Sequence, residues 1–238
     1  MRTAAVAAAH TAAGYPSPTA SAVVSRTQSG VRRLQGVRPD KKSPLTAADI
    51  VRVVNEISPS SGLLGVRDRA VLRAGFATAM RRSELAALDI GHLQFVEEGL
   101  LIDIPRSKRD QEGSGQRIAV PHGGCHCPVG ALKACLDGAE IIDGPVFLPF
   151  SRGRRVLDRA LSEKQIARIV KQRAARAGFD ADAYSGHSLR SGFLTTAGQN
   201  RANLWKVAEV SRHRPIDTLR DYVQATELFD DHAGAGML

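Results

Sequence analysis

A single change of hydrophobic period constrains the fold more than any other feature of this chain of 238 residues. Apolar residues recur at helical spacing through most of the sequence, as they do over residues 50–57. Between Leu93 and Val120 the period becomes that of short strands. Residues 93–96 and 100–104 flank a polar turn, and residues 118–120 supply a third strand. The sequence therefore predicts a mainly α fold with one small antiparallel β-sheet, an α+β class.

The expected helices carry recognisable start signals. Thr46 with Asp49, and Ser162 with Gln165, have the spacing of a capping box, in which each side chain satisfies a backbone amide of the first turn. Gly178 ends the helix that Ser162 begins. Further helices are expected at residues 20–34, 67–79, 83–88, 128–139, 187–199, 203–210 and 216–227.

Positive charge is concentrated at the start of the chain. Of a formal net charge of +9, residues 1–42 hold +6, with seven arginines and lysines against Asp40 alone. Such a segment favours a polyanionic partner, because lysine and arginine neutralise phosphates and release counterions. A solubilising basic tail is the competing interpretation of the charge alone.

The cysteines and the apolar stretches of the chain indicate where in the cell the protein is expected. The three cysteines are an odd number, and the alanine-rich start of the chain lacks a leucine-type apolar stretch, so a reducing compartment and free thiols are expected. No run approaches the roughly 18 apolar residues that span a bilayer. We therefore expect a cytoplasmic, nucleoid-associated protein without a membrane.

Four segments occur in an informative order. Residues 78–85 read TAMRRSEL and resemble the TGLRxSEL signature of the tyrosine site-specific recombinases, the phage-integrase family. Residues 107–113 resemble the lysine segment of that family's β-hairpin, and residues 186–190 match its H-x-L-R box. Residues 211–213, with Tyr222 nine positions after His213, resemble its last box and its tyrosine. Each pattern is weak alone, but together they are specific and cover roughly residues 45–230.

The resemblance implies a domain organisation and an activity. Residues 1–41 would be a remnant, or the C-terminal part, of a helical core-binding domain with a basic linker. Residues 42–238 would be the catalytic domain, with a C-terminal tail from about residue 224. The family implies site-specific recombination or integration, in which a DNA strand is cleaved and rejoined through a 3′-phosphotyrosine, typically for a mobile element. The activity of a chain with so short a front segment stays open.

The chemistry also explains why such residues occur together. Attack of a hydroxyl on a phosphodiester places charge on non-bridging oxygens, which guanidinium groups stabilise with paired hydrogen bonds. Arg81 and Arg190 are the candidates for this role, and His213 adds a donor. Lys108 can protonate the leaving 5′-oxygen, while His187 can accept the proton of the nucleophile or orient the phosphate. No cofactor is expected.

Double-stranded DNA is the expected partner, with self-association, a tetramer on paired sites, for strand exchange. Two groups of basic residues are candidates for the DNA backbone. They are Arg32, Arg33, Lys41 and Lys42 near the start, and Arg106, Arg152 and Arg154 further along.

Each candidate also has a plain structural interpretation. Arg81 can be a solvated helix end, Lys108 part of a charged turn, and Tyr222 a half-buried helix residue. His187 and His213 can be ordinary surface histidines. These interpretations hold singly but fit poorly together.

Two further hypotheses concern metal and the family match. The run from His122 to Cys127 invites a zinc interpretation, but Cys125 and Cys127 are too close for a finger knuckle, so no metal site is expected. Ala79 stands where the family usually has glycine, and Arg212 replaces the glycine of its common Leu-Gly-His box. The functional positions are nevertheless present.

Three other functions compete with recombination. A type IB topoisomerase uses the same chemistry but reseals the same strand, so relaxation without sequence preference would favour it. A catalytically silent or truncated DNA-binding remnant would retain DNA without any covalent adduct. A helical protein with only a basic tail would bind weakly and without salt dependence.

Overall fold

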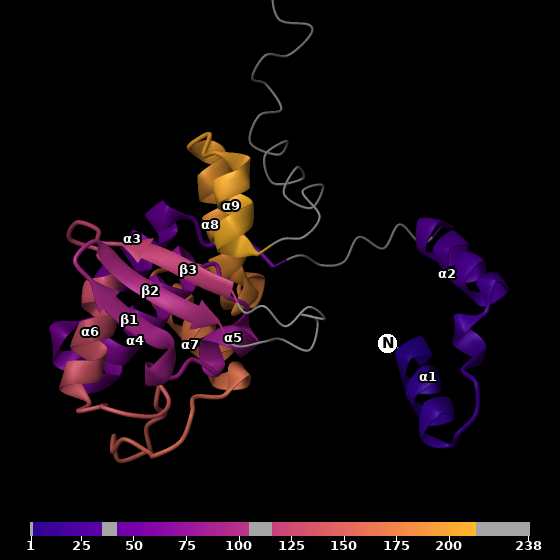
Figure 1. Ribbon diagram of the computed structural model, residues 1–238, viewed down its shortest axis with the longest axis horizontal. Helices are drawn as coiled ribbons and strands as arrows, with labels where there is room; N and C mark the ends of the chain where they lie inside the picture. Colours follow the sequence, from indigo (N-terminus) through magenta and orange to yellow (C-terminus); the bar gives the residue numbers. More distant parts are fainter. Residues whose placement is uncertain (1, 35–41, 105–115, 213–238) are drawn as a thin grey trace, which may run out of the picture. The chain divides into compact units, whose positions relative to one another are not determined.

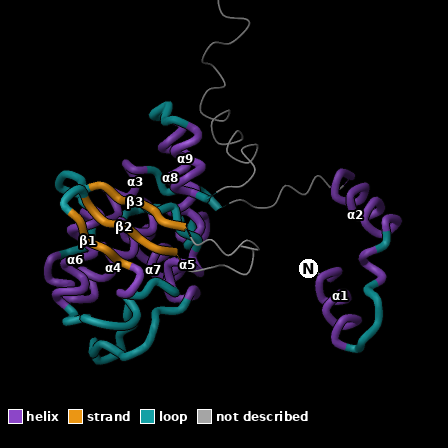
Figure 2. Tube along the Cα trace, in the orientation of Figure 1, coloured by secondary structure: helices purple, strands orange, loops and turns teal. Residues whose placement is uncertain are grey.

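The structure is a computed structural model that describes residues 2–34, 42–104 and 116–212 (Figure 1). The chain separates into two units, Met1–Lys41 and Lys42–Leu238. Helices dominate both units, and one three-stranded sheet lies in the second (Figure 2). The predicted α+β class is confirmed.

The first unit is helical in its described part. It contains α1 (Arg2–Ala12), a 3-10 turn η1 (Pro18–Ala20) and α2 (Ala22–Leu34). The sequence predicted α2 within two residues of its start, but it did not predict α1. Alanine has the highest intrinsic helix propensity, which accounts for a helix in a stretch without an amphipathic pattern.

The second unit alternates helices with one strand-rich stretch. Its elements, in order, are α3 (Ala47–Asn55), η2 (Pro59–Ser61), α4 (Gly62–Ala77), α5 (Arg82–Ala86), η3 (Ile90–His92), β1 (Leu93–Val96), β2 (Gly99–Ile104), β3 (Gln116–Pro121), α6 (Pro128–Gly138), α7 (Glu163–Arg176), η4 (Ala181–Ala183), α8 (His187–Gln199) and α9 (Leu204–Ser211).

Local capping accounts for two helix starts. The Thr46 side chain accepts from the amide of Asp49, and the Asp49 carboxylate accepts from the amide of Thr46 at 2.9 Å. Ser162 and Gln165 form the equivalent pair at the start of α7. Both predicted capping boxes are confirmed. Helix α4 begins five residues before the predicted Arg67, because the turn Pro59–Ser61 leads directly into it.

The sheet is antiparallel with strand order β1-β2-β3. Leu93 pairs with Ile102, and Ile102 pairs with Ile118. Alternate residues of β2 and β3 point inward and join a core with α4 and α6. A second core, which includes Leu45, Leu72 and Leu189, joins α3, α4, α7 and α8. Helix α4 contributes to both cores and so holds the sheet and α8 in one framework.

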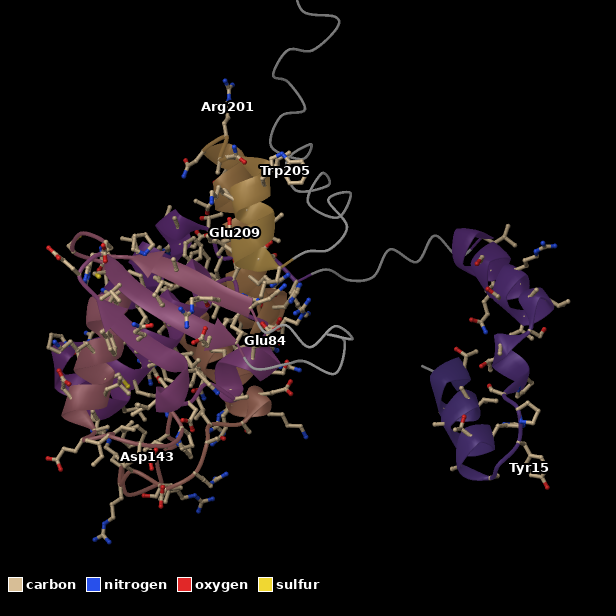
Figure 3. All side chains as sticks on the ribbon, viewed as in Figure 1. Tyr15, Glu84, Asp143, Arg201, Trp205 and Glu209 are labelled. Atoms are coloured by element: carbon tan, nitrogen blue, oxygen red, sulfur yellow. The ribbon has the colours of Figure 1, made fainter. Side chains whose placement is uncertain are left out.

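Charged groups also link the buried elements. The Asp68 carboxylate on α4 accepts from Arg67 at 2.7 Å and from Arg173 on α7 at 2.6 Å, and all three side chains are buried. Trp205 and Glu209 project from α9, and Trp205 is exposed (Figure 3). Of the helices that the structure describes, none combines the length and the apolarity that crossing a membrane requires.

Candidate active site

Arg81 lies in a tight turn between α4 and α5. Ala79 has a φ of +47°, in the left-handed region, and is fully buried. Arg81 then returns to extended backbone and caps the start of α5. Its amide donates to Oε2 of Glu84 at 2.8 Å, and its Nη1 lies 2.6 Å from Oε1 of the same carboxylate. Glu84 therefore holds both the amide and the guanidinium of Arg81, while the side chain as a whole remains 44% exposed.

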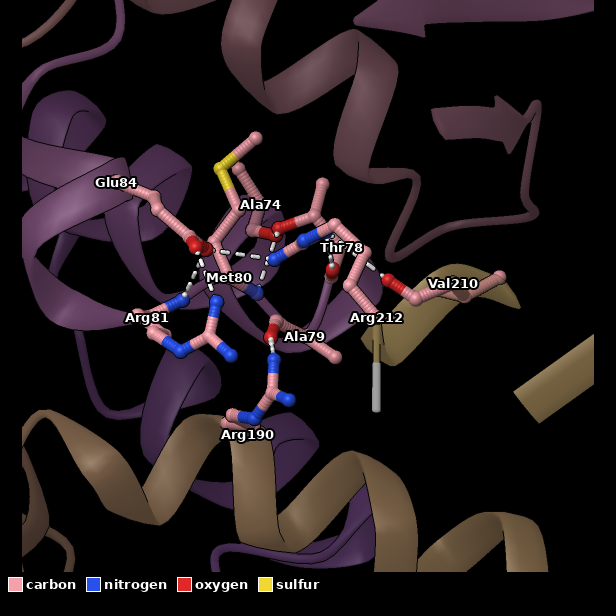
Figure 4. Close-up of polar contacts among 9 residues, drawn as sticks. All are labelled: Ala74, Thr78, Ala79, Met80, Arg81, Glu84, Arg190, Val210 and Arg212. Carbon is pink, nitrogen blue, oxygen red and sulfur yellow. Dashed lines mark hydrogen bonds and ion pairs between the residues drawn. The ribbon is translucent and has the colours of Figure 1, made fainter. Parts of the chain in front are cut away.

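Arg190 and His187 share one face of α8. They are separated by three positions, a spacing that places two side chains one turn apart on the same side of a helix. Arg190 is buried and donates from Nη1 to the carbonyl oxygen of Ala79 at 2.6 Å (Figure 4). This bond ties α8 to the turn that carries Arg81.

His187 lies in a strongly positive field. Partial desolvation by its surroundings and the charges of Arg190, Arg81 and Arg82 lower the pKa of the imidazole below its usual value of 6.5. At neutral pH the ring is therefore neutral and can accept a proton. The structure thus brings together three predicted site residues, Arg81, His187 and Arg190.

Close backbone packing fixes α8 in this position. A Cβ on Gly192 would lie 1.7 Å from the carbonyl oxygen of Leu45, so only glycine permits this approach. The amide of Leu45 also donates to the carbonyl oxygen of Ser188 on α8, at 2.9 Å. The helix that carries His187 and Arg190 is therefore anchored directly to the start of the second unit.

One residue of this cluster was not predicted from the sequence. Arg212, the C-cap of α9, has a φ of +55° and a buried side chain, and its Nη2 lies 2.6 Å from Oε2 of Glu84. Its Nη1 donates to the carbonyl of Val210 at 3.0 Å. The available signal was the replacement of a common glycine by arginine, which by itself gives no partner.

This arrangement suits a substrate with concentrated negative charge. Two fixed guanidinium groups can donate paired hydrogen bonds to phosphate oxygens, and a neutral imidazole beside them can accept a proton. Such preorganised donors act without reorganisation at the moment of reaction.

Comparison with known proteins agrees with this chemistry. The phage integrase family matches residues 44–228, most of the chain. The chain belongs to the phage integrase family.

Curated relatives carry the same assignment. The integrase/recombinase xerD homolog of Selenomonas ruminantium is 35% identical over 237 residues, which cover 98% of this chain and 69% of that protein. Tyrosine recombinase XerC of Lactobacillus delbrueckii subsp. bulgaricus is 29% identical over 181 residues, 74% of this chain and 55% of that protein. The chain thus spans between about half and two thirds of these relatives.

Solved structures show the same fold. XerH site-specific recombinase, bound to a palindromic difH substrate in a post-cleavage complex, gives a TM-score of 0.62 at 21% identity. That match covers 79% of this chain and 51% of the XerH chain. XerA recombinase gives a TM-score of 0.57 at 21% identity, over 79% of this chain and 60% of that one. The predicted family and fold are therefore confirmed, and the topoisomerase and silent-remnant alternatives are not favoured.

Three predicted catalytic residues of this integrase-family chain, Lys108, His213 and Tyr222, lie outside the described residues. His213 directly follows Arg212, whose backbone is described. The roles of all six residues remain predictions.

The predicted DNA-contacting residues are distributed over both units of the chain. Arg152 and Arg154 are exposed on the loop between α6 and α7. Lys42 donates from Nζ to the carbonyl of Asp182 at 2.8 Å. Arg32 and Arg33 belong to α2 in the first unit, whereas Lys41 and Arg106 lie outside the described residues.

Cys127 is the N-cap residue of α6. Its thiol accepts from the amides of Gly123 and Gly130, both at 3.3 Å. The pKa of this thiol is lowered to about 7, because these backbone donors and His122 outweigh the effect of burial. Over residues 2–34, 42–104 and 116–212, no three side chains of His, Cys, Asp or Glu come together as metal ligands.

Tyr184 packs edge-on against Phe179, with ring centroids 5.5 Å apart. Tyr15, the other described tyrosine, is 68% exposed in the first unit.

Proposed function

We propose that this integrase-family chain is a site-specific DNA recombinase that cleaves and rejoins strands through a 3′-phosphotyrosine on Tyr222. The observation that carries the proposal is the hydrogen bond from Arg190 to Ala79, because it sets a second guanidinium beside the turn of Arg81. The membership of the family supplies the reaction class.

In this proposal Arg81 and Arg190 bind the non-bridging oxygens of the scissile phosphate, and His213 adds a further donor. The charge on these oxygens increases in the transition state, so the donors contribute more there than in the ground state. Arg190 is buried and fixed, whereas Arg81 is partly exposed. We infer that Arg190 sets the position of the phosphate and that Arg81 binds it from the more exposed side.

The proposal assigns each proton transfer to one of the predicted residues. The Tyr222 hydroxyl oxygen forms a bond to phosphorus as the bond to the 5′-oxygen breaks. The proton of Tyr222 passes to His187, whose lowered pKa keeps its ring free to accept it at neutral pH. Lys108 gives a proton to the departing 5′-oxygen. Attack by the 5′-hydroxyl of a partner strand reverses these steps and completes the exchange.

Duplex DNA is the proposed partner. The basic front of the chain, residues 1–42, would contact the phosphate backbone, with Arg32, Arg33, Lys41 and Lys42 as the leading candidates. Arg106, Arg152 and Arg154 would extend this contact from the second unit.

Residues 1–41 would be the last part of a core-binding domain, and residues 42–238 the catalytic domain with its tail. Strand exchange would involve a tetramer on paired sites, on the nucleoid.

Covalent trapping tests the proposal. Nicked duplexes made from the DNA that flanks the gene are incubated with the wild type, Tyr222→Phe and Arg190→Ala, and run on denaturing gels. A nick lets the short cleaved fragment diffuse away, so the adduct accumulates. The proposal expects a slowly migrating adduct with the wild type alone. An adduct that survives Tyr222→Phe would contradict it.

A further inference from the structure

Arg212 occupies a backbone position that favours glycine. Its φ and ψ are +55° and +44°, the left-handed conformation in which a side chain brings Cβ close to the following carbonyl oxygen. The phage integrase family commonly has glycine at this position of its Leu-Gly-His box. Contacts made by the side chain can offset the strain of such a conformation.

The side chain of Arg212 makes such contacts across the fold. It extends from the end of α9 to Glu84 on α5, where its Nη2 lies 2.6 Å from Oε2 (Figure 4). Its Nη1 donates to the carbonyls of Val210 at 3.0 Å and Thr78 at 3.5 Å. Only 4% of the side chain is exposed, so these bonds form away from water, where they are strong.

Glu84 thus serves two guanidinium groups at once. Arg81 bonds to both of its oxygens, and Arg212 bonds to Oε2. Burial alone would raise the pKa of Glu84, but the charge of Arg212 and the hydrogen bonds from Arg81 outweigh this, and the pKa is lowered. The carboxylate is ionised, so the trio carries a net charge of +1. Without Arg212, the Arg81 and Glu84 pair would be neutral.

We propose that Arg212 is a positioning residue for the strand-cleavage reaction. It shares the carboxylate of Glu84 with Arg81, so the group keeps a net positive charge toward the DNA phosphate. It also fixes the turn of Thr78 to the end of α9, immediately before His213. This inference rests on the proposed function. It adds a residue that acts through Arg81 and does not itself touch the phosphate.

The alternative is that Arg212 only stabilises the fold. Arg173 provides a matched comparison, because its guanidinium is equally buried, at 4% exposure, and lies 2.6 Å from the Asp68 carboxylate. The Arg67, Asp68 and Arg173 trio also shares one carboxylate between two arginines, but it involves none of the predicted catalytic residues.

Three variants separate the two roles. Arg212→Gly removes the side chain and suits the left-handed backbone, so it deletes the contacts without adding strain. Arg212→Lys keeps the positive charge but loses the forked hydrogen bonds. Arg173→Lys makes the same conservative change in the matched trio.

The first readout is the single-turnover rate of adduct formation on the nicked duplex, per folded molecule. Arg212→Gly is expected to slow it on the order of 10- to 100-fold, the usual effect of misplacing a catalytic group. Arg212→Lys should recover part of that loss. Arg173→Lys should lower the melting temperature but leave the rate unchanged. A wild-type rate in Arg212→Gly, or equal slowing in Arg173→Lys, would overturn the inference.

The second readout needs no DNA. Within the part of the chain that the structure describes, the charges that lower the pKa of His187 are those of Arg190 on its own helix, Arg81 in the turn and Arg82 on α5. If the loss of Arg212 leaves the Arg81 and Glu84 pair with no net charge, the positive potential at His187 falls and the pKa of His187 rises in Arg212→Gly. NMR titration measures this pKa, with His187→Gln to assign the signal among the seven histidines. Lys206→Ala, which removes an exposed charge from α9, is the control and should leave it unchanged.

The two readouts separate the two claims. If the wild type forms no adduct, the proposed function fails, and the NMR titration still tests whether Arg212 controls the charge that acts on His187. A His187 pKa that is the same in the wild type and Arg212→Gly would overturn the inference even when the wild type cleaves DNA.

Discussion

Arg190 and Ala79 are joined by a hydrogen bond of 2.6 Å from Nη1 to the carbonyl oxygen, although 111 positions separate them in the sequence. A guanidinium has five N–H donors, so one bond to the main chain orients the group without exhausting it. The left-handed conformation of Ala79 turns its carbonyl toward α8. The turn of Arg81 and the helix of His187 are thereby fixed to each other.

Replacing Arg190 by lysine tests whether this geometry matters more than charge. Lysine retains the charge but cannot bond the Ala79 carbonyl and a phosphate with one planar group. Arg190→Lys should lower the single-turnover cleavage rate by about 10²- to 10³-fold, as for the loss of one preorganised donor. The rate is measured on the nicked duplex at saturating protein. Cleavage at the wild-type rate would show that charge alone is sufficient.

The contact between Gly192 and Leu45 predicts a strong effect on stability. A methyl group on Gly192 would overlap the Leu45 carbonyl oxygen, so α8 would have to move away. Gly192→Ala should cost about 3 kcal/mol or more of unfolding free energy, at or above the upper range for an overpacked interior. Urea denaturation measures the loss. Gly124→Ala, where an added Cβ meets open space, is the control and should have little effect.

The local features of the fold were predictable, and the features between distant segments were not. The capping boxes at Thr46 and Ser162 depend on residues three positions apart, so a sequence pattern contains them completely. The strands at Leu93 and Ile102 follow from alternation and a turn. The early start of α4 at Gly62 was missed because Pro59 and Gly62 also serve as signals for the end of a helix.

The candidate site shows the same division. Arg81, His187 and Arg190 were predicted from motif spacing, but their proximity depends on Ala79 and Gly192, whose backbone roles no spacing shows. The partnership of Arg212 with Glu84 spans 128 positions and depends on a left-handed residue at the end of α9. Such a pair becomes visible only when the positions of α5 and α9 in the fold are known.

Glu84 predicts a specific dependence of stability on pH. Its pKa in the folded protein lies below the usual 4.5, so its contribution to stability is complete above pH 4.5 and is lost as the pH falls through the lowered value. Glu84→Gln removes a buried partner of two arginines and should cost about 3 kcal/mol at neutral pH. The difference from the wild type should shrink below pH 4.5.

Urea denaturation at a series of pH values measures this difference. Glu163→Gln breaks an exposed ion pair with Arg82 and serves as the control. The difference in unfolding free energy between the wild type and Glu84→Gln could instead stay constant down to strongly acidic pH. That result would show that Arg81 and Arg212 do not stabilise an ionised Glu84 carboxylate.

The basic front of the chain predicts the salt dependence of DNA binding. If Arg32 and Arg33 contact phosphates, Arg32→Ser with Arg33→Ser should reduce the slope of log K against log salt by about 0.9 per lost contact. Fluorescence anisotropy with a labelled duplex measures the slope. The same double change at Arg152 and Arg154 tests the loop of the second unit separately. An unchanged slope would remove that pair from the interface.

The identity of the nucleophile is the central claim. The covalent complex formed on a nicked duplex is digested with nuclease and trypsin, and the nucleotide-bearing peptide is sequenced by mass spectrometry. Cleavage after Arg220 gives a peptide of residues 221–238 with Tyr222 as its only tyrosine. The account predicts a 3′-linked nucleotide on Tyr222. A nucleotide on any other residue of the chain would contradict it.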